Sequence, residues 1–457
     1  MVDVRGKTVV GRFIHAPHAG TVEILSEALV GIDQNGAITT VLMASDAGHD
    51  AAVAAARDAG TLVRLPPRAA VLPGFVDLHV HAPQYPQLGK ALDAPLEVWL
   101  ERHTFPLEAR YADLSFARTV YETLVSDLLA GGTTTALYFA TIHPEATRML
   151  AAICLAHGQR ALVGKVAMDH PENCPPFYRD ASAESAIAQT RALIAAIAAL
   201  PGNAGRVEAV ATPRFIPACT DPLLEGLGAL VAECGCAVQT HCSESDWAHG
   251  YGLARYGRTD AEMLDRFGLL TRRTVLAHGN FLTAADMDRL AARGASVAHC
   301  PLSNAYFANA VFPLHAALEK RVRVGLGTDI SGGPTSSMLE VQRMAVAASR
   351  MLEAGVDPDR PAAKRGRPGV RITLPLAFHL ATAGGADALD LPVGHFAPGR
   401  RFDALLVDPD APGSTMRLFD EVDAEADLIE TIIYTASRPN LTCVWVDGRA
   451  VAGAGSA

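Results

Sequence analysis

Short apolar runs alternate with longer stretches of helical spacing through the middle of the chain. From Val71 onward the runs are AVLPGFVDLHVH, TTTALYF, ALVGKVAM, RVEAVATPRF, CAVQTH, TVLAH, ASVAHC and VRVGLGTD. Eight buried strands alternating with helices favour a (β/α)8 barrel, although a doubly wound sheet gives the same alternation. The intervening LTAADMDRLAARG predicts one of the helices, with Thr283 as its N-cap and Gly294 at its end.

The polar residues at the ends of these runs decide between the two folds. Nearly every run ends in His, Asp or Arg at its C-terminal end. In a (β/α)8 barrel these strand ends meet at one mouth, which is where such barrels place their chemistry. The pattern therefore predicts an α/β protein with a catalytic, TIM-like barrel over residues 71–393.

The two ends of the chain have a different texture. Residues 8–70 contain β-rich runs broken by Gly, Asn and Asp, and Asn35-Gly36 is a strong hairpin signal. The Ala-rich stretch 51–60 fits a helix or a loop. The same β texture returns after residue 394, in FAPGRRFDALLVDP and LTCVWVDGRAV. We expect residues 1–70 and 394–457 to pair into one small β-sandwich domain built from both chain ends.

Composition narrows the function classes. The formal net charge is −10 and no basic stripe appears, which argues against a nucleic-acid partner. No apolar run is long enough to span a bilayer, and the N-terminus lacks the apolar core of a signal peptide. The eight cysteines are scattered without a CxxC pair, which is typical of reduced thiols. A cytoplasmic protein acting on a small molecule, with no membrane partner, is expected.

Five side chains at four strand ends suit a metal ion. His79 and His81 lie two apart on a predicted strand, so both face the barrel mouth. A single HxH pair is weak evidence, because surface histidines share this spacing by chance. His241, His278 and Asp329 end three further strands, and convergence of all five is poorly explained by packing alone.

Two more acidic residues complete the candidate site. Glu244 follows His241 by three residues, in a loop from which a carboxylate can reach both the metal-activated water and the substrate as a proton shuttle. Asp77 is expected to orient a ligand histidine. Lys165 lies early in its strand, away from the mouth, which argues against a second, lysine-bridged metal.

These motifs resemble the amidohydrolase superfamily in its mononuclear zinc deaminase branch, and within that branch the guanine deaminases. PGFVDLHVH, THCSE, LAHG and GTD carry the superfamily resemblance. The narrower resemblance rests on HAPQY (81–85), WLERHTFPLEARYAD (99–113), GGTTTALYFATIH (131–143), GKVAMD (164–169), TPRFIPAC (212–219), THCSES (240–245), HCPLSN (299–304) and GLGTDISGG (325–333). It covers almost the whole chain.

The resemblance implies a role for each matching residue. One Zn²⁺ per chain would be held by His79, His81, His241 and Asp329, with His278 hydrogen-bonded to the water or to a substrate atom. Glu244, His278 and Asp329 would act in catalysis, converting guanine to xanthine and ammonia. Gln84, Arg214 and Phe215 would hold the purine, with His241 and Tyr85 beside it. A homodimer is also implied.

The chemistry of these side chains fits a purine. Arg214 is a donor suited to a carbonyl oxygen, Gln84 can read a purine edge, and Phe215 offers a ring face. Tyr85 serves equally well as a packing residue. The long segment from Gln84 to about Asp113 is expected to cover the site as a lid.

Two alternatives remain at this stage. Another amidohydrolase acting on an oxidised purine, a pterin or a triazine, including a chlorohydrolase, would keep the zinc ligands and differ in the purine-reading residues. A non-catalytic scaffold of the same fold would be expected to have lost ligands that are all present here.

Overall fold

Eight parallel strands form the larger of two sheets. The computed structural model describes residues 2–308, 310–419 and 421–453. The strands follow one another in the sheet in sequence order, with the short β9 (Val166–Ala167) paired to β10 beside them. They are β6 (Phe75–His81), β7 (Thr133–Phe139), β8 (Arg160–Gly164), β10 (Val207–Pro213), β11 (Ala237–Cys242), β12 (Thr274–His278), β13 (Ser296–His299) and β14 (Arg323–Leu326).

The sheet closes on itself at the mouth. The amide of Asp329 donates to His79 O (2.8 Å), and the amide of His81 donates to Ile330 O (3.0 Å). These bonds join the segment after β14 to the first strand. The predicted (β/α)8 barrel is confirmed, and its closure lies beside the predicted metal ligands.

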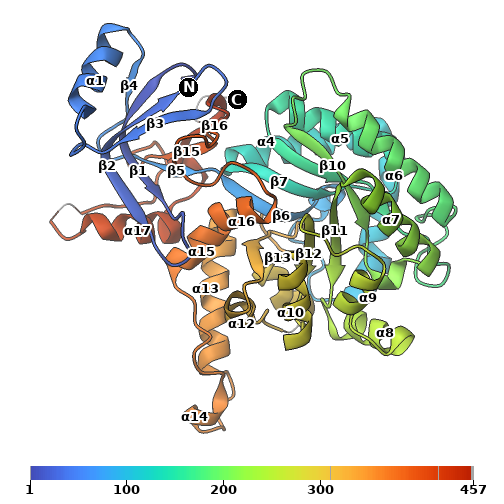
Figure 1. Ribbon diagram of the computed structural model, residues 1–457. Coiled ribbons are helices and arrows are strands. Elements are labelled where there is room, and N and C mark those ends of the chain that lie inside the picture. Colours follow the sequence, from blue (N-terminus) through green and yellow to red (C-terminus); the bar gives the residue numbers. More distant parts are fainter. Residues whose placement is uncertain (1, 309, 420, 454–457) are drawn as a thin grey trace.

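Helices surround the barrel (Figure 1). They are α4 (Leu114–Ala130), α5 (Pro144–His157), α6 (Ala183–Ala198), α7 (Asp221–Cys234), α8 (Asp246–Tyr256), α9 (Asp260–Arg266), α10 (Ala284–Arg293), α11 (Pro301–Ser303), α12 (Leu314–Glu319), α13 (Met338–Ala354), α14 (Ala362–Arg365), α15 (Leu374–Ala381) and α16 (Ala383–Ala388). Helix α10 begins after Thr283, which forms a capping box with Asp286, and ends at left-handed Gly294, as predicted. None of the helices described is long and apolar enough to cross a bilayer.

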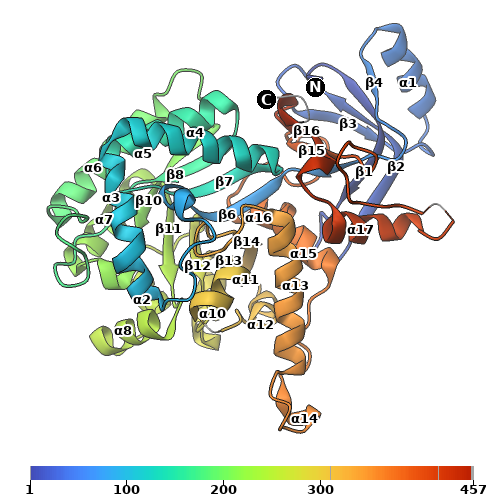
Figure 2. The same ribbon diagram turned by 180° about the vertical axis from the view of Figure 1, so that it is seen from behind.

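The second sheet combines both chain ends, as predicted. Both terminal markers lie beside it in two opposite views (Figures 1 and 2). Its path is β17-β16-β15-β5-β1-β2-β3, with β4 on β1. The strands are β1 (Thr8–His15), β2 (Glu23–Ile32), β3 (Ile38–Leu42), β4 (Leu62–Arg64), β5 (Ala70–Pro73), β15 (Ala404–Val407), β16 (Leu441–Val446) and β17 (Arg449–Gly453), and its helices are α1 (His49–Asp58) and α17 (Leu428–Thr435). The Asn35-Gly36 turn joins antiparallel β2 and β3.

The first predicted run is divided between the two sheets, which corrects its reading as one barrel strand. Its first part, β5, pairs with β1 and β15 in the small sheet, and its second part, β6, starts the barrel. Gly74 separates them. A Cβ atom there would lie 2.1 Å from the Thr134 hydroxyl, so only glycine lets the chain pass this close to β7.

A buried ion cluster joins the small sheet to the barrel. Arg160 on β8 donates to Asp403 (3.1 Å) and to Asp447 (2.9 Å), which lies in the β16–β17 turn. Arg206 and Arg401 also bind the Asp447 carboxylate, at 2.8 and 2.6 Å. The cluster therefore ties the two sheets together at the end of the barrel where the strands begin.

The segment after β6 consists of short helical turns rather than an open loop. They are η1 (Ala82–Gln87), α2 (Leu96–Trp99), the π-helical η2 (Leu100–Thr104), α3 (Phe105–Ala109) and η3 (Arg110–Ala112). A second π-helical turn, η5 (Asn304–Ala308), follows α11. The rings of Trp99, at the end of α2, and Phe307, in η5, lie 5.0 Å apart.

Candidate active site

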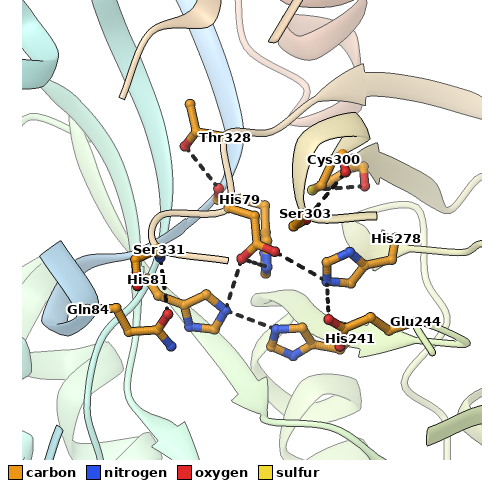
Figure 3. Close-up of polar contacts among 12 residues, drawn as sticks. His79, His81, Gln84, His241, Glu244, His278, Cys300, Ser303, Thr328 and Ser331 are labelled. Carbon is orange, nitrogen blue, oxygen red and sulfur yellow. Dashed lines mark hydrogen bonds and ion pairs between the residues drawn. The ribbon is translucent and has the colours of Figure 1, made fainter. Parts of the chain in front are cut away.

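Strand alternation and barrel closure bring the four predicted ligands together. His79 and His81 are buried on β6, and His241 is buried at the end of β11. Asp329 Oδ1 lies 3.2 Å from His79 Nε2 and 3.5 Å from His81 Nε2. His81 Nε2 and His241 Nε2 are 3.0 Å apart (Figure 3). Four side chains from three separate strand ends therefore face one point.

The protonation of these histidines suits a cation. Burial lowers the pKa of His79, His81 and His241 well below the ordinary value, so all three are neutral at physiological pH. His241 Nδ1 lies 2.6 Å from Arg214 O, and since a carbonyl only accepts, Nδ1 carries the proton and Nε2 presents a lone pair.

The donor set passes a direct test of fit. His79 Nε2 is buried without a hydrogen-bond partner among the described residues, which is costly unless a ligand binds there. His81 and His241 turn ring nitrogens toward each other at 3.0 Å, an arrangement that a shared cation stabilises. Three imidazoles and one carboxylate are ligands that zinc accepts. The side chains of His79, His81 and His241 form a group compact enough to hold one ion.

His278 and Glu244 lie next to this group and to each other. His278 Nε2 is 3.6 Å from Glu244 Oε1 and 3.8 Å from Asp329 Oδ2. Its Nδ1 donates to Asn304 Oδ1 (3.0 Å), which also accepts from Asn280 Nδ2. Nδ1 is therefore protonated, and Nε2 is free to accept a hydrogen bond.

Burial also sets the charge of the two carboxyl groups. It raises the pKa of Glu244 well above the ordinary value, and nearby Asp329 adds to this while Arg214 opposes it. Burial raises the pKa of Asp329 as well, against the effect of His278. The raised pKa favours the protonated form of Glu244, which is the form in which a carboxyl group can donate a proton.

Backbone strain is concentrated here. Ser243, His278 and Asp329 have φ values of +48°, +72° and +50°, in the left-handed region that L-residues with side chains rarely adopt. Such conformations occur where surrounding structure fixes a functional geometry. Asp77 contributes to that structure: it accepts from the His79 amide (3.2 Å) and the Thr328 amide (3.0 Å). It thus binds the backbone of the candidate ligand His79 and of the segment after β14, and the contact with His79 runs through the backbone amide.

A narrow cavity leads to this centre. Its lining comprises His81, Gln84, Leu96, Trp99, Leu100, Arg214, Phe215, His241, Glu244, Phe307, Asp329 and Gly332. The predicted purine-binding residues Gln84, Arg214 and Phe215 are therefore in the same cavity as the metal group. Tyr85 is not among the lining residues, because its hydroxyl donates to Asp127 on α4.

The sequence analysis missed a carboxylate that binds Gln84 and Arg214, the two residues that form the polar wall of the cavity. Glu108 accepts from Arg214 Nη1 (2.7 Å) and Nη2 (3.2 Å), and from Gln84 Nε2 (2.8 Å). Its carboxylate raises the pKa of Arg214 against the effect of burial. An arginine that ends a barrel strand requires an anionic partner, and the TFPLE segment, already singled out, contains it. Trp99 and Phe307 were also missed, because aromatic residues in irregular segments have no periodic signal.

The fold and this centre define a metal-dependent hydrolase of the amidohydrolase class. The model of the Amidohydrolase family matches residues 70–451, so the chain belongs to that family.

Among its relatives are guanine deaminases. The chain is 37% identical over 450 residues to the probable guanine deaminase of Schizosaccharomyces pombe, covering 97% of this chain and 83% of that protein. It is similar to the crystal structure of guanine deaminase from C. acetobutylicum with bound guanine, with a TM-score of 0.85, 27% identity and coverage of 97% and 99%. It is also similar to an adenosine deaminase from Xanthomonas campestris with bound zinc, with a TM-score of 0.79, 26% identity and coverage of 98% and 92%.

Proposed function

We propose that this protein is a zinc-dependent guanine deaminase, which hydrolyses guanine to xanthine and ammonia. The observation that carries the proposal is one cavity whose lining combines His81, His241 and Asp329 of the candidate metal group with Glu244 and with the polar side chains of Gln84 and Arg214. The relatives named guanine deaminase, at 37% identity in one case, support the same activity.

His79, His81, His241 and Asp329 would hold the zinc ion. When bound, it would supply a water molecule acidic enough to act as a nucleophile near neutral pH. A relative with bound zinc supports this choice of metal.

The protein's own residues then move protons. Neutral His278 accepts a hydrogen bond at Nε2 from the nucleophilic water, and Asp329 accepts a proton as the water oxygen bonds to C2 of guanine. Glu244, which carries a proton, donates it to the neighbouring ring nitrogen so that charge does not accumulate on the ring. The C2–N2 bond breaks as the proton taken from water passes from Asp329 to the leaving amine. The new C2 hydroxyl gives its proton to the Glu244 carboxylate as the C2 carbonyl forms, which restores Glu244 to its protonated state. Xanthine and ammonia contain all the atoms of guanine and water.

The rest of the cavity orients the purine and excludes solvent. Arg214 and Gln84 are available as donors to ring substituents, and Phe215 offers a ring face, supported from behind by Trp247 at 5.8 Å. Trp99 and Phe307 meet above the cavity. Segment 84–113, which carries Trp99, would act as a lid that opens and closes the cavity.

The direct test is a spectrophotometric assay of xanthine formation from guanine, with a panel of an oxidised purine, a pterin and a triazine alongside. The wild type should prefer guanine. Glu244→Gln preserves shape but removes the transferable proton, so kcat should fall at least about 100-fold at unchanged zinc content. Preference for another heterocycle would refute the substrate, and full activity of Glu244→Gln would refute the shuttle.

The proposal includes a homodimer in the cytoplasm. Eight unpaired cysteines support a reducing compartment. Light scattering of the purified protein tests the dimer, since a monomer at micromolar concentration would contradict it.

A further inference from the structure

Glu108 is a fully buried carboxylate just outside the cavity lining. It is 0% exposed and lies on α3, within segment 84–113. It has no contact with the metal group, yet it binds both polar side chains of the purine-reading wall. Its Oε1 accepts from Gln84 Nε2 (2.8 Å), and its two oxygens accept from the Arg214 guanidinium at 2.7 and 3.2 Å.

These contacts remove the ambiguity of the Gln84 amide. A carboxylate only accepts hydrogen bonds, so the amide nitrogen must face Glu108. On the other side, the Ser331 backbone amide donates to Gln84 Oε1 (3.1 Å). Turning the amide over would place oxygen against oxygen and N–H against N–H in a buried site. Gln84 is therefore locked with its remaining N–H available, and its oxygen is occupied by the backbone.

Arg214 is fixed by the same carboxylate. The guanidinium is buried, packs against the Phe105 ring at 5.0 Å, and has Glu108 as its ion-pair partner. An arginine has only donors, and two of its N–H groups are taken by Glu108. Because Gln84 Oε1 already accepts from the Ser331 amide, the polar wall formed by Gln84 and Arg214 offers mainly hydrogen-bond donors to a substrate.

We propose that Glu108 is a positioning residue that keeps this wall rich in hydrogen-bond donors, and that it thereby selects a 2-aminopurine with an oxygen rather than an amino group at C6. The inference rests on the proposed function. Guanine presents acceptors at O6 and N7 to such a wall. 2,6-Diaminopurine has the same reacting 2-amino group, but its 6-amino group would meet donors and leave buried polar groups unpaired, which is strongly unfavourable.

Two variants distinguish a change in the hydrogen-bonding pattern of the wall from a loss of folding. Glu108→Gln removes the charge and lets residue 108 donate, but it leaves Arg214 buried without its anion. The exchange Gln84→Glu/Glu108→Gln keeps one carboxylate beside Arg214 and one amide. In this exchange the side chain at position 84 still accepts from Ser331 N and from the amide of residue 108. It loses its N–H, however, so a hydrogen-bond donor of the wall is replaced by an acceptor. Glu225→Gln, an exposed change of the same charge on α7, is the matched control.

The measurement is kcat/KM for guanine and for 2,6-diaminopurine, with zinc content and thermal unfolding of each purified variant. We expect the wild type and Glu225→Gln to share one strong preference for guanine. In the folded, zinc-loaded exchange variant this preference should fall at least about tenfold, mainly through a higher KM for guanine. Glu108→Gln should lower it in the same direction.

A folded, zinc-loaded exchange variant with the wild-type preference would overturn the role of Glu108. So would a loss of kcat that is equal for both substrates, because a purely structural defect affects them alike. Wild-type protein inactive on guanine would overturn the proposed function together with this inference, whereas an active wild type with an unchanged preference in the exchange variant overturns this inference alone.

Discussion

Replacing Asp447 by Asn should weaken the attachment of the small sheet to the barrel. Asp447 binds Arg160, Arg206 and Arg401, and its own amide donates to Asp403 (2.8 Å). Asparagine has the same shape and tolerates the left-handed backbone of this position (φ +49°). The substitution therefore removes charge with little steric change, and it leaves Arg160 with only Asp403.

The size of the effect follows from the pKa of Asp447. Burial alone would raise it, but Arg160 and the two other guanidinium groups outweigh burial and lower it from 3.8 to about 2. At about 1.4 kcal/mol per unit, this shift corresponds to about 2 kcal/mol of stability at neutral pH. Removing one partner of a buried ion pair costs about 3–5 kcal/mol. We therefore expect a loss of about 2–4 kcal/mol, or roughly 2–4 °C in Tm for a chain of this length.

The pH dependence identifies the cause. Because the folded-state pKa is depressed, the carboxylate stabilises the fold fully above the ordinary value of 3.8, and that contribution is lost as pH falls toward 2. Unfolding of the wild type and Asp447→Asn, followed by denaturant titration between pH 7 and pH 2.5, should show a difference in unfolding free energy that narrows as the pH falls below about 4. Glu225→Gln should differ from the wild type by under about 0.5 kcal/mol. A difference between wild type and Asp447→Asn that is absent at pH 7, or constant across this range, would refute the reasoning.

Three further predictions concern the site. Dialysis against a chelator should abolish deamination and lower Tm, and zinc should restore both; a Tm that does not respond to metal would contradict the donor set. Since burial raises the pKa of Glu244, kcat should fall as pH rises through that raised value and Glu244 loses its proton; a rate that stays level well into the alkaline range would contradict the acid role. Trp99→Ala removes the ring that contacts Phe307, so KM for guanine should rise about tenfold or more at unchanged zinc content. Leu253→Ala, at an exposed site on α8, is the control. Equal KM values in the two variants would show that Trp99 does not contribute to closing the cavity.

Much of the site could be predicted from the sequence, because strand periodicity and the location of polar residues at strand ends indicate which side chains lie together. Two histidines two apart on a strand share a face, and strand ends in a parallel barrel share a mouth. His79, His81, His241, His278 and Asp329 were therefore predicted together from local patterns, and the structure brings all five together. The capping of α10 was equally local, since Thr283 and Gly294 act within one turn of the helix ends.

Other features depended on partners far apart in the chain. Nothing near Tyr85 indicates that its hydroxyl binds Asp127, 42 residues away, instead of facing the cavity. The division of the first apolar run at Gly74 reflects contact with Thr134 and pairing of β5 with β15, more than 300 positions along the chain. Periodicity predicts which face of an element is apolar, but it does not predict which distant element packs against that face.

The sequence by itself predicted the barrel, the pairing of both chain ends and the convergence of polar side chains at the barrel mouth, because each follows from strand period and turn chemistry. The choice of four zinc ligands among those side chains came from the family resemblance. Only the tertiary structure decided which residues form hydrogen bonds with Gln84 and Arg214 in the wall of the cavity. Glu108 lies 106 positions from Arg214 and 24 from Gln84, and all three are buried together. The direction of these hydrogen bonds depends on neighbours in space, and it fixes the Gln84 amide with its nitrogen toward Glu108 and its oxygen toward the Ser331 amide.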